Sequence, residues 1–219
     1  MQELVYLFII FIIYSIIGWL IEICLSILEH KKFINRGFLF GPYCPIYGVG
    51  CLCLIYVLKK YNDDLLALFT IGTFLCSVLE YFTSYLLEKI FKARWWDYSH
   101  IPFNVNGRIC LSNSLLFGIA GIFVYKFNPF LLEKLQSIPV TIFYIIAILI
   151  LIIFIIDVII SFNIVNKLKL AALNSKSDNT EEIKGKISNL LKTNSNKFRR
   201  LLQAFPDATI SNIKKLKKK

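Results

Sequence analysis

The chain has 219 residues, of which 57% are hydrophobic and only 18% are charged, and its formal net charge is +11. A soluble domain carries about a quarter charged residues, and the charges here are separated by long uncharged stretches. The composition therefore argues against a soluble globular domain and predicts an all-α polytopic membrane protein.

The positive charge is concentrated after residue 166. Residues 167–219 contain fourteen Lys and Arg against four Asp and Glu, whereas the preceding residues are close to neutral. We therefore divide the chain into a transmembrane helix bundle, residues 1–166, and a basic cytoplasmic tail, residues 167–219. Membrane lipids with anionic headgroups are the nearest polyanion for such a tail, and no motif indicates nucleic-acid binding.

Five apolar segments are candidates to cross a bilayer, which takes about 20 helical residues. They are Leu4–Leu28, Gly37–Leu58, Leu65–Leu87, Ile109–Tyr125 and Ile138–Val165. Lys and Arg favour cytoplasmic connections. Placing the first and third connections and the tail inside gives twenty-one basic residues inside and four outside. This predicts five transmembrane helices with the N-terminus outside and the C-terminus inside.

Single carboxylates interrupt three of these segments, namely Glu22, Glu80 and Asp157. A carboxylate at a helix centre costs about 2.5–3.5 kcal/mol on insertion scales, so each is expected to face protein or water. All three lie roughly 9–12 Å before the cytoplasmic end of their segment, at a rise of about 1.5 Å per residue. We therefore expect them at one depth in the bilayer.

Two of the carboxylates belong to polar stripes with helical spacing. The stripe on the first segment consists of Ser15, Trp19, Glu22 and Ser26. The stripe on the third consists of Thr73, Ser77, Glu80, Ser84 and Glu88. The fourth segment has a small-residue face suited to close helix approach, formed by Cys110, Ser114, Gly118 and Gly121.

Arg108 begins the fourth segment on the cytoplasmic side. We expect a cytoplasm-facing polar cavity lined by Glu22 and Glu80, with Arg108 as the counter-charge. The alternative is a buried ionic lock that only fixes helix packing. The other expected lining residues are Trp19, Asn106, Asn113, Tyr43, Tyr47 and Asp97. We expect no catalytic residue, cofactor or metal site.

Residues 37–50 contain four glycines and two prolines, so they cannot begin as a regular helix. One interpretation is a broken helix that lines a wet cavity. The other is a tight entry loop at the headgroup level, followed by a helix that starts near Pro45.

Residues 94–108 contain Trp95, Trp96 and Tyr98, aromatic rings that prefer the headgroup zone. This segment is either an interfacial anchor or a lid over the cavity. In the tail, apolar residues between Ile183 and Phe205 follow helical spacing, which predicts an amphipathic cytoplasmic helix that lies on the inner leaflet or binds a partner.

Four sequence elements carry a family resemblance: GWLIE (Gly18–Glu22), RGFLFGPYCPIYGVG (Arg36–Gly50), Glu80 with Tyr81, and WWDYS with FNVNGRICL (Trp95–Leu111). Together they resemble the bacterial family labelled putative ABC-transporter type IV permeases, over about residues 4–165. The resemblance implies a transport component in the bacterial cell membrane. The sequence contains no G-x-x-x-x-G-K-[S/T] loop, so ATP hydrolysis would need a separate ATPase subunit.

Transport is the function we favour from the sequence. One alternative is an assembly or regulatory membrane protein that recruits a partner through its tail. Another is a membrane-embedded lipid-modifying enzyme with a glutamate as general base and Arg108 holding phosphate. Five helices are few for an enclosed path, so a homodimer is a further expectation.

Overall fold

The computed structural model describes residues 2–35, 37–61, 64–91, 93–173 and 209–210. These residues form five helices: α1 (Gln2–His30), α2 (Pro45–Leu58), α3 (Leu65–Phe91), α4 (Leu111–Gln136) and α5 (Val140–Leu173). Two antiparallel pairs of two-residue strands are also present: β1 (Ala93–Arg94) pairs with β4 (Thr209–Ile210), and β2 (Asn104–Val105) pairs with β3 (Ile109–Cys110). The all-α prediction is confirmed, while the predicted tail helix lies outside the described residues.

Four of these helices, α1, α3, α4 and α5, are long and apolar enough to cross a membrane. The fifth, α2, has 14 residues and is about 21 Å long at 1.5 Å per residue, which is less than the hydrocarbon thickness of about 30 Å. The predicted second segment is therefore divided. Residues 37–44 are not helical, and the helix begins at the predicted start, Pro45.

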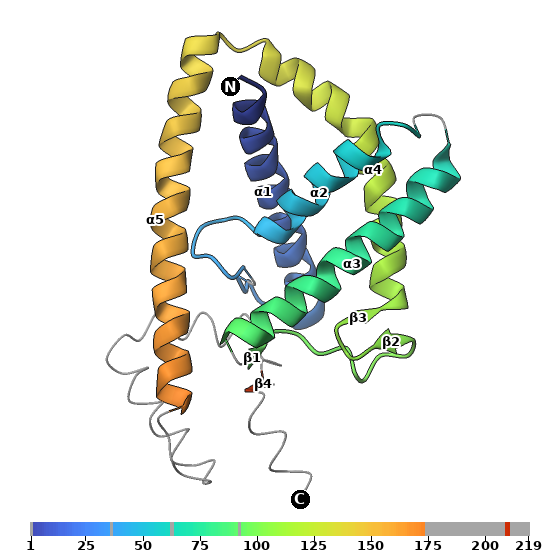
Figure 1. The fold of residues 1–219 in the computed structure, drawn as a ribbon, viewed down its shortest axis with the longest axis vertical. Coiled ribbons are helices and arrows are strands. Elements are labelled where there is room, and N and C mark those ends of the chain that lie inside the picture. Colours follow the sequence, from blue (N-terminus) through green and yellow to red (C-terminus); the bar gives the residue numbers. More distant parts are fainter. Residues whose placement is uncertain (1, 36, 62–63, 92, 174–208, 211–219) are drawn as a thin grey trace, which may run out of the picture.

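Helix α4 extends well past its predicted end at Tyr125 and contains Pro129. Proline lacks the amide hydrogen that a helix interior needs and bends the helix there. Figure 1 shows α4 changing direction on its way to the turn that leads into α5.

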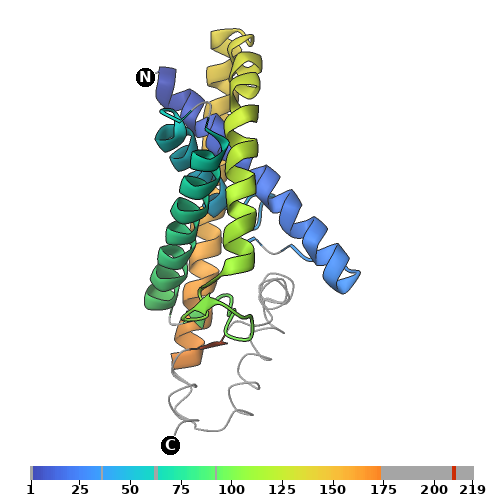
Figure 2. The ribbon, with the colours of Figure 1, turned by 90° about the vertical axis from the view of Figure 1, so that its right-hand side faces the viewer.

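The helical body has two distinct ends along its long axis (Figure 1). The start of α1 and the α4–α5 turn lie at one end. The end of α3, the β2–β3 hairpin and the end of α5 lie at the other, which we call the hairpin end. The second half of α1 leans away from the remaining helices (Figure 2). The polar connection between α3 and α4 therefore lies at the same end of the body as the end of α5.

Helices α3 and α4 pack closely through small residues. A Cβ atom added at Gly72 would lie 3.5 Å from the Cα atom of Gly121, and one added at Gly118 would collide with Thr73 and Phe69. The Ser77 hydroxyl donates to the Ser114 hydroxyl at 2.7 Å across this interface. The predicted small-residue face of α4 is confirmed, and it allows the polar stripe of α3 to lie inside the protein.

Helices α1 and α2 also approach closely. A Cβ atom at Gly18 would collide with the ring of Tyr47, and one at Gly48 would collide with the Ser15 hydroxyl. The Cys44 amide donates to the Ser15 carbonyl at 2.9 Å. This contact holds the Tyr47 ring against the face of α1 that carries the first polar stripe.

Candidate functional site

Two carboxylates and two phenols form a cluster supplied by α1, α2, α3 and the segment after α3. The Tyr47 hydroxyl donates to Glu22 Oε1 at 2.6 Å, and the Tyr98 hydroxyl donates to Glu80 Oε1 at 3.2 Å. We call Glu22, Tyr47, Glu80 and Tyr98 the carboxylate cluster. Three of its members were expected to line a cavity, and Tyr98 was expected to belong to an interfacial anchor or to a lid over that cavity.

The two halves of the cluster lie within electrostatic range of each other. Glu22 and Glu80 interact as like charges. Burial raises the pKa of Tyr98 well above its ordinary range, and the negative charges of Glu80 and Glu22 raise it further. Tyr98 therefore keeps its hydrogen and remains a donor. The structure thus brings together the two glutamates that the sequence placed at one depth.

Glu80 is the most deeply buried charged group of the cluster. The residue is 7% exposed, and its Oε2 atom has no hydrogen-bond partner among the described residues. A buried polar atom left without a partner costs about 1–3 kcal/mol, and more when it is charged. The cluster is therefore incompletely satisfied at this atom.

Arg108 lies on the same side of α3 but has a different partner from the one expected. Its guanidinium donates to Glu88 Oε2 at 2.8 Å and to the Ser84 hydroxyl at 3.1 Å. It also lies over the rings of Tyr81 and Tyr85, 5.7 and 5.6 Å from their centroids. The expected pairing of Arg108 with Glu22 and Glu80 is corrected to an ion pair with Glu88, about two turns further along α3.

The β2–β3 hairpin explains where Arg108 lies. Asn106 and Gly107 have φ values of +55° and +66°, and the Arg108 amide donates to the Val105 carbonyl at 3.0 Å. Positive φ at both central residues defines a type I′ turn, which Asn-Gly favours. Arg108 follows this turn at the hairpin end, beside the last part of α3 where Glu88 lies. The Asn-Gly dipeptide is the sequence signal for this hairpin, which was not among the predicted elements.

Asp97 and Asn106 stabilise the segment that carries Tyr98. The Asp97 carboxylate accepts the Ser99 amide at 3.1 Å, the Ser99 hydroxyl and the Arg94 guanidinium at 3.4 Å. The Asn106 amide donates to the Tyr81 hydroxyl at 3.0 Å. The Tyr98 amide donates to the Gly107 carbonyl at 2.8 Å. These bonds fold the segment onto itself and onto α3, so Asp97 and Asn106 support the cluster from outside it.

The remaining expected residues are dispersed. The Trp19 indole donates to Asn35 Oδ1 at 2.9 Å, and the ring of Tyr43 is buried with its centroid 5.4 Å from that of Phe154. Asn113 is half-buried near the start of α4. The described contacts of Trp19 and Tyr43 lie in the loop before α2 and on α5 rather than in the carboxylate cluster.

Asp157 anchors the irregular segment before α2. Its carboxylate accepts the backbone amides of Phe40 at 3.0 Å and Gly41 at 2.7 Å, and the Ser161 hydroxyl at 3.0 Å. The third carboxylate is therefore satisfied by donors from the loop and from its own helix. Its role is to hold residues 37–44 beside the middle of α5.

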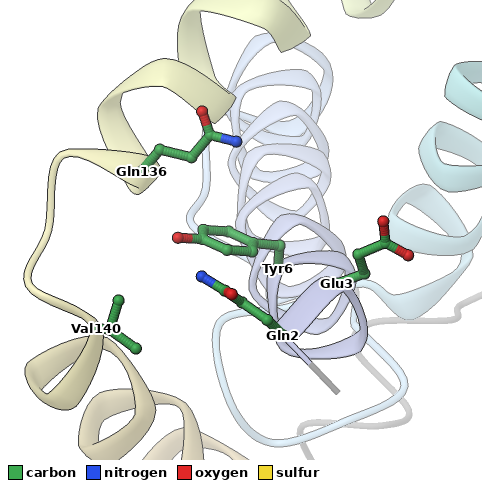
Figure 3. A pocket seen from close by; sticks show the side chains of 5 residues that line it. All are labelled: Gln2, Glu3, Tyr6, Gln136 and Val140. Carbon is green, nitrogen blue, oxygen red and sulfur yellow. The ribbon is translucent and has the colours of Figure 1, made fainter.

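An open hollow of about 380 Å³ lies at the end of the body opposite the hairpin end (Figure 3). Its lining residues are Gln2, Glu3, Tyr6, Gln136 and Val140. None of them belongs to the carboxylate cluster, so this hollow is separate from the cavity expected from the sequence. Within the described ranges, no group of three His, Cys, Asp or Glu side chains is placed to hold a metal ion.

A family model described as putative ABC-transporter type IV matches residues 9–162. The match extends from the first turns of α1 into the second half of α5 and includes the whole carboxylate cluster. No curated protein and no solved structure matches the chain.

Proposed function

Because the chain belongs to the putative ABC-transporter type IV family, we propose that it is the membrane-embedded permease subunit of an ABC transporter. In this proposal it resides in the bacterial cell membrane, with the hairpin end and the basic tail in the cytoplasm. The excess of Lys and Arg at that end supports this orientation. The carboxylate cluster lies on the substrate path and is reached from the cytoplasmic side.

The observation that carries the proposal is the pair of like charges formed by Glu22, which is half-buried, and Glu80, which is buried. Ionisable groups among apolar helices are costly, and they mark substrate or ion paths more often than structural contacts. An ionic lock would need opposite charges in contact. Glu80 accepts the Tyr98 hydroxyl at Oε1, and its Oε2 atom has no hydrogen-bond partner among the described residues, which favours a path over a lock at Glu80.

ATP hydrolysis would come from a separate ATPase subunit, since the sequence lacks the phosphate-binding loop. We propose the hairpin end as its docking surface. The segment from Arg94 to Arg108 supports this, because it is a folded polar connection held by ion pairs of Arg94 and Arg108 with Glu88. Movement of this segment would reach Glu80 through Tyr98. A homodimer would supply the additional helices for an enclosed path.

The proposal is tested by purifying the full chain from its native membranes and identifying the proteins that accompany it. We expect a stoichiometric ATPase, and its hydrolysis rate should fall in the Glu22→Gln and Glu80→Gln complexes at matched abundance. Glu133→Gln is the control, because Glu133 is an exposed glutamate on α4. Absence of an ATPase, or variants that lose only abundance, would favour an assembly role instead.

A further inference from the structure

Phe103 has a backbone conformation that its side chain does not favour. Its φ is +54°, in the left-handed region that glycine and asparagine adopt readily and that a bulky side chain rarely adopts. The Phe103 carbonyl accepts the Leu111 amide at 3.1 Å. The Asn104 side chain closes the preceding turn by donating to the Ile101 carbonyl at 2.7 Å. These bonds hold Phe103 in the unfavourable conformation.

The ring that this strained position presents is exposed. Phe103 is 80% exposed, and Val105 beside it in the β2–β3 hairpin is also exposed. The Phe103 ring therefore contributes little to packing within the described protein. Backbone strain persists where the surrounding structure enforces it, and such positions cluster at binding sites. A strained residue with an outward ring is thus a candidate contact for something outside the protein.

The three rings that were expected to anchor this segment in the headgroup zone are engaged within the protein. Trp95 is 8% exposed, the Trp96 indole donates to a backbone carbonyl at 3.0 Å, and the Tyr98 hydroxyl donates into the carboxylate cluster. Of the Phe, Trp and Tyr residues described between positions 94 and 108, only Phe103 is exposed. An anchoring role for this segment would therefore belong to Phe103.

The hairpin lies beside a part of α3 that precedes the expected boundary between lipid and water. That boundary is marked by Lys89, whose ammonium lies 6.0 Å from the centroid of the exposed Tyr85 ring, since Lys and Tyr side chains at a helix end favour the interface. The Asn106 amide donates to the Tyr81 hydroxyl at 3.0 Å. Tyr81 precedes Lys89 by about 12 Å at a rise of 1.5 Å per residue. The tip of the hairpin is therefore on the bilayer side of Lys89.

The exposed apolar surface of α4 begins beside Phe103. Leu111, whose amide binds the Phe103 carbonyl, is exposed, as are Leu115 and Ile119. Steps of four residues place these three side chains on one helix face, and α4 is apolar enough to cross a membrane. The position of Phe103 thus continues a surface that acyl chains would cover.

We infer that Phe103 inserts into the bilayer and contacts lipid acyl chains, which anchors the segment that carries Tyr98. A rigid apolar side chain at this level enters the boundary between headgroups and acyl chains. The Ile101 amide donates to the Tyr98 carbonyl at 2.9 Å, so Tyr98 and Phe103 belong to one bonded turn. Lipid packing around Phe103 would then affect the bond from Tyr98 to Glu80. Assignment to the cytoplasmic leaflet rests on the proposed orientation, whereas insertion itself requires neither an ATPase nor transport.

The first test replaces Phe103 in the full chain by p-benzoylphenylalanine, a photoreactive analogue that keeps the aromatic ring, and irradiates native membranes. Phe74 is the lipid-facing control position, because it is 71% exposed on α3. His100 is the control within the same segment, since it is also exposed. We expect lipid adducts at Phe103 in a yield similar to that at Phe74 and several-fold above that at His100. A lipid yield no higher than at His100, or an adduct of Phe103 with another protein, would overturn the inference.

The second test separates anchoring from a role of the ring within the fold. Phe103→Asn removes the ring and also relieves the backbone, because asparagine tolerates positive φ. Phe103→Trp keeps a large ring for the bilayer. In lipid nanodiscs, hydrogen exchange of the amides between residues 98 and 101 should accelerate about tenfold in Phe103→Asn and stay near the wild-type rate in Phe103→Trp. Wild-type exchange in Phe103→Asn would exclude the anchor.

The outcome is separable from that of the transport proposal. If lipid adducts form at Phe103 and no ATPase accompanies the chain, the anchor stands and the transport proposal fails. If an ATPase accompanies the chain and is itself the adduct at Phe103, the docking surface stands and this inference alone fails.

Discussion

The Tyr98 hydroxyl donates to Glu80 Oε1 at 3.2 Å, which joins the polar segment after α3 to a carboxylate buried within α3. The same segment carries Asp97, Gly107 and Arg108, whose bonds give it a fixed shape. A displacement at the hairpin end would therefore be transmitted to Glu80 through a single hydrogen bond. This is the structural basis for linking cytoplasmic events to the carboxylate cluster.

Tyr98→Phe removes the described hydrogen-bond donor of Glu80 and leaves both of its carboxylate oxygens unsatisfied. We expect the free energy of unfolding in detergent to fall by about 1.5–3 kcal/mol, the range for a hydrogen bond to a charged group. Tyr56→Phe is the matched control, because Tyr56 is exposed on α2. Equal stability of the two variants would contradict the role of Tyr98.

A double-mutant cycle checks the partner of Arg108. Since Arg108 donates to Glu88 at 2.8 Å, the cycle between Arg108→Met and Glu88→Gln should give a coupling free energy of about 0.5–3 kcal/mol. The cycle between Arg108→Met and Glu80→Gln should give less than about 0.5 kcal/mol. A larger coupling free energy with Glu80 than with Glu88 would show that Arg108 is the counter-charge of Glu80, as expected from the sequence.

Asp157→Asn weakens the attachment of residues 37–44 to α5, because an amide accepts less strongly than the carboxylate that now binds the Phe40 and Gly41 amides. Hydrogen exchange of the peptide containing these amides should accelerate about tenfold. Asp64→Asn is the control. Asp64 caps α3 by accepting the Ala67 amide, and asparagine caps a helix about as well as aspartate. Unchanged exchange in Asp157→Asn would exclude the attachment.

Gly118→Ala tests the close packing of α3 against α4. The added methyl group would collide with Thr73 and Phe69, and overpacking of this kind costs about 1–3 kcal/mol. Gly50→Ala is the control, since its methyl group would meet Cys76 and Leu79 at an ordinary 3.9 Å. Thermal unfolding should show a large loss in Tm for Gly118→Ala and little or no loss for Gly50→Ala.

The helices could be predicted from the sequence because their apolar content dominates every window of bilayer length. The boundaries could be predicted less well where charges lie within a helix. Lys126, Glu133 and Lys134 belong to α4, although charges at these positions favour a connection between two spans. Propensity and hydropathy cannot distinguish a charged last turn from a loop when the helix extends past the bilayer core.

The helix faces that carry the candidate site could be predicted from the sequence, but the contacts between its side chains could not. Helical spacing placed Glu22 and Glu80 on interior stripes, and the structure brings them together. The partner of Arg108 and the orientation of Tyr98 depend on the β2–β3 hairpin, which sets their position along α3. The position of the hairpin along α3 depends on tertiary contacts. The Asn106–Gly107 turn is the sequence feature that indicates this hairpin.

The most direct test of the central claim is a double-mutant cycle of Glu22→Gln and Glu80→Gln, measured as free energies of unfolding of the full chain in detergent. If the two carboxylates form one cluster, the relief of their repulsion is counted in each single variant but can occur only once. The double variant should then be less stable than the sum of the single effects predicts, by about 0.5–3 kcal/mol. Effects that add within about 0.5 kcal/mol would show that the two glutamates act independently and would contradict the account.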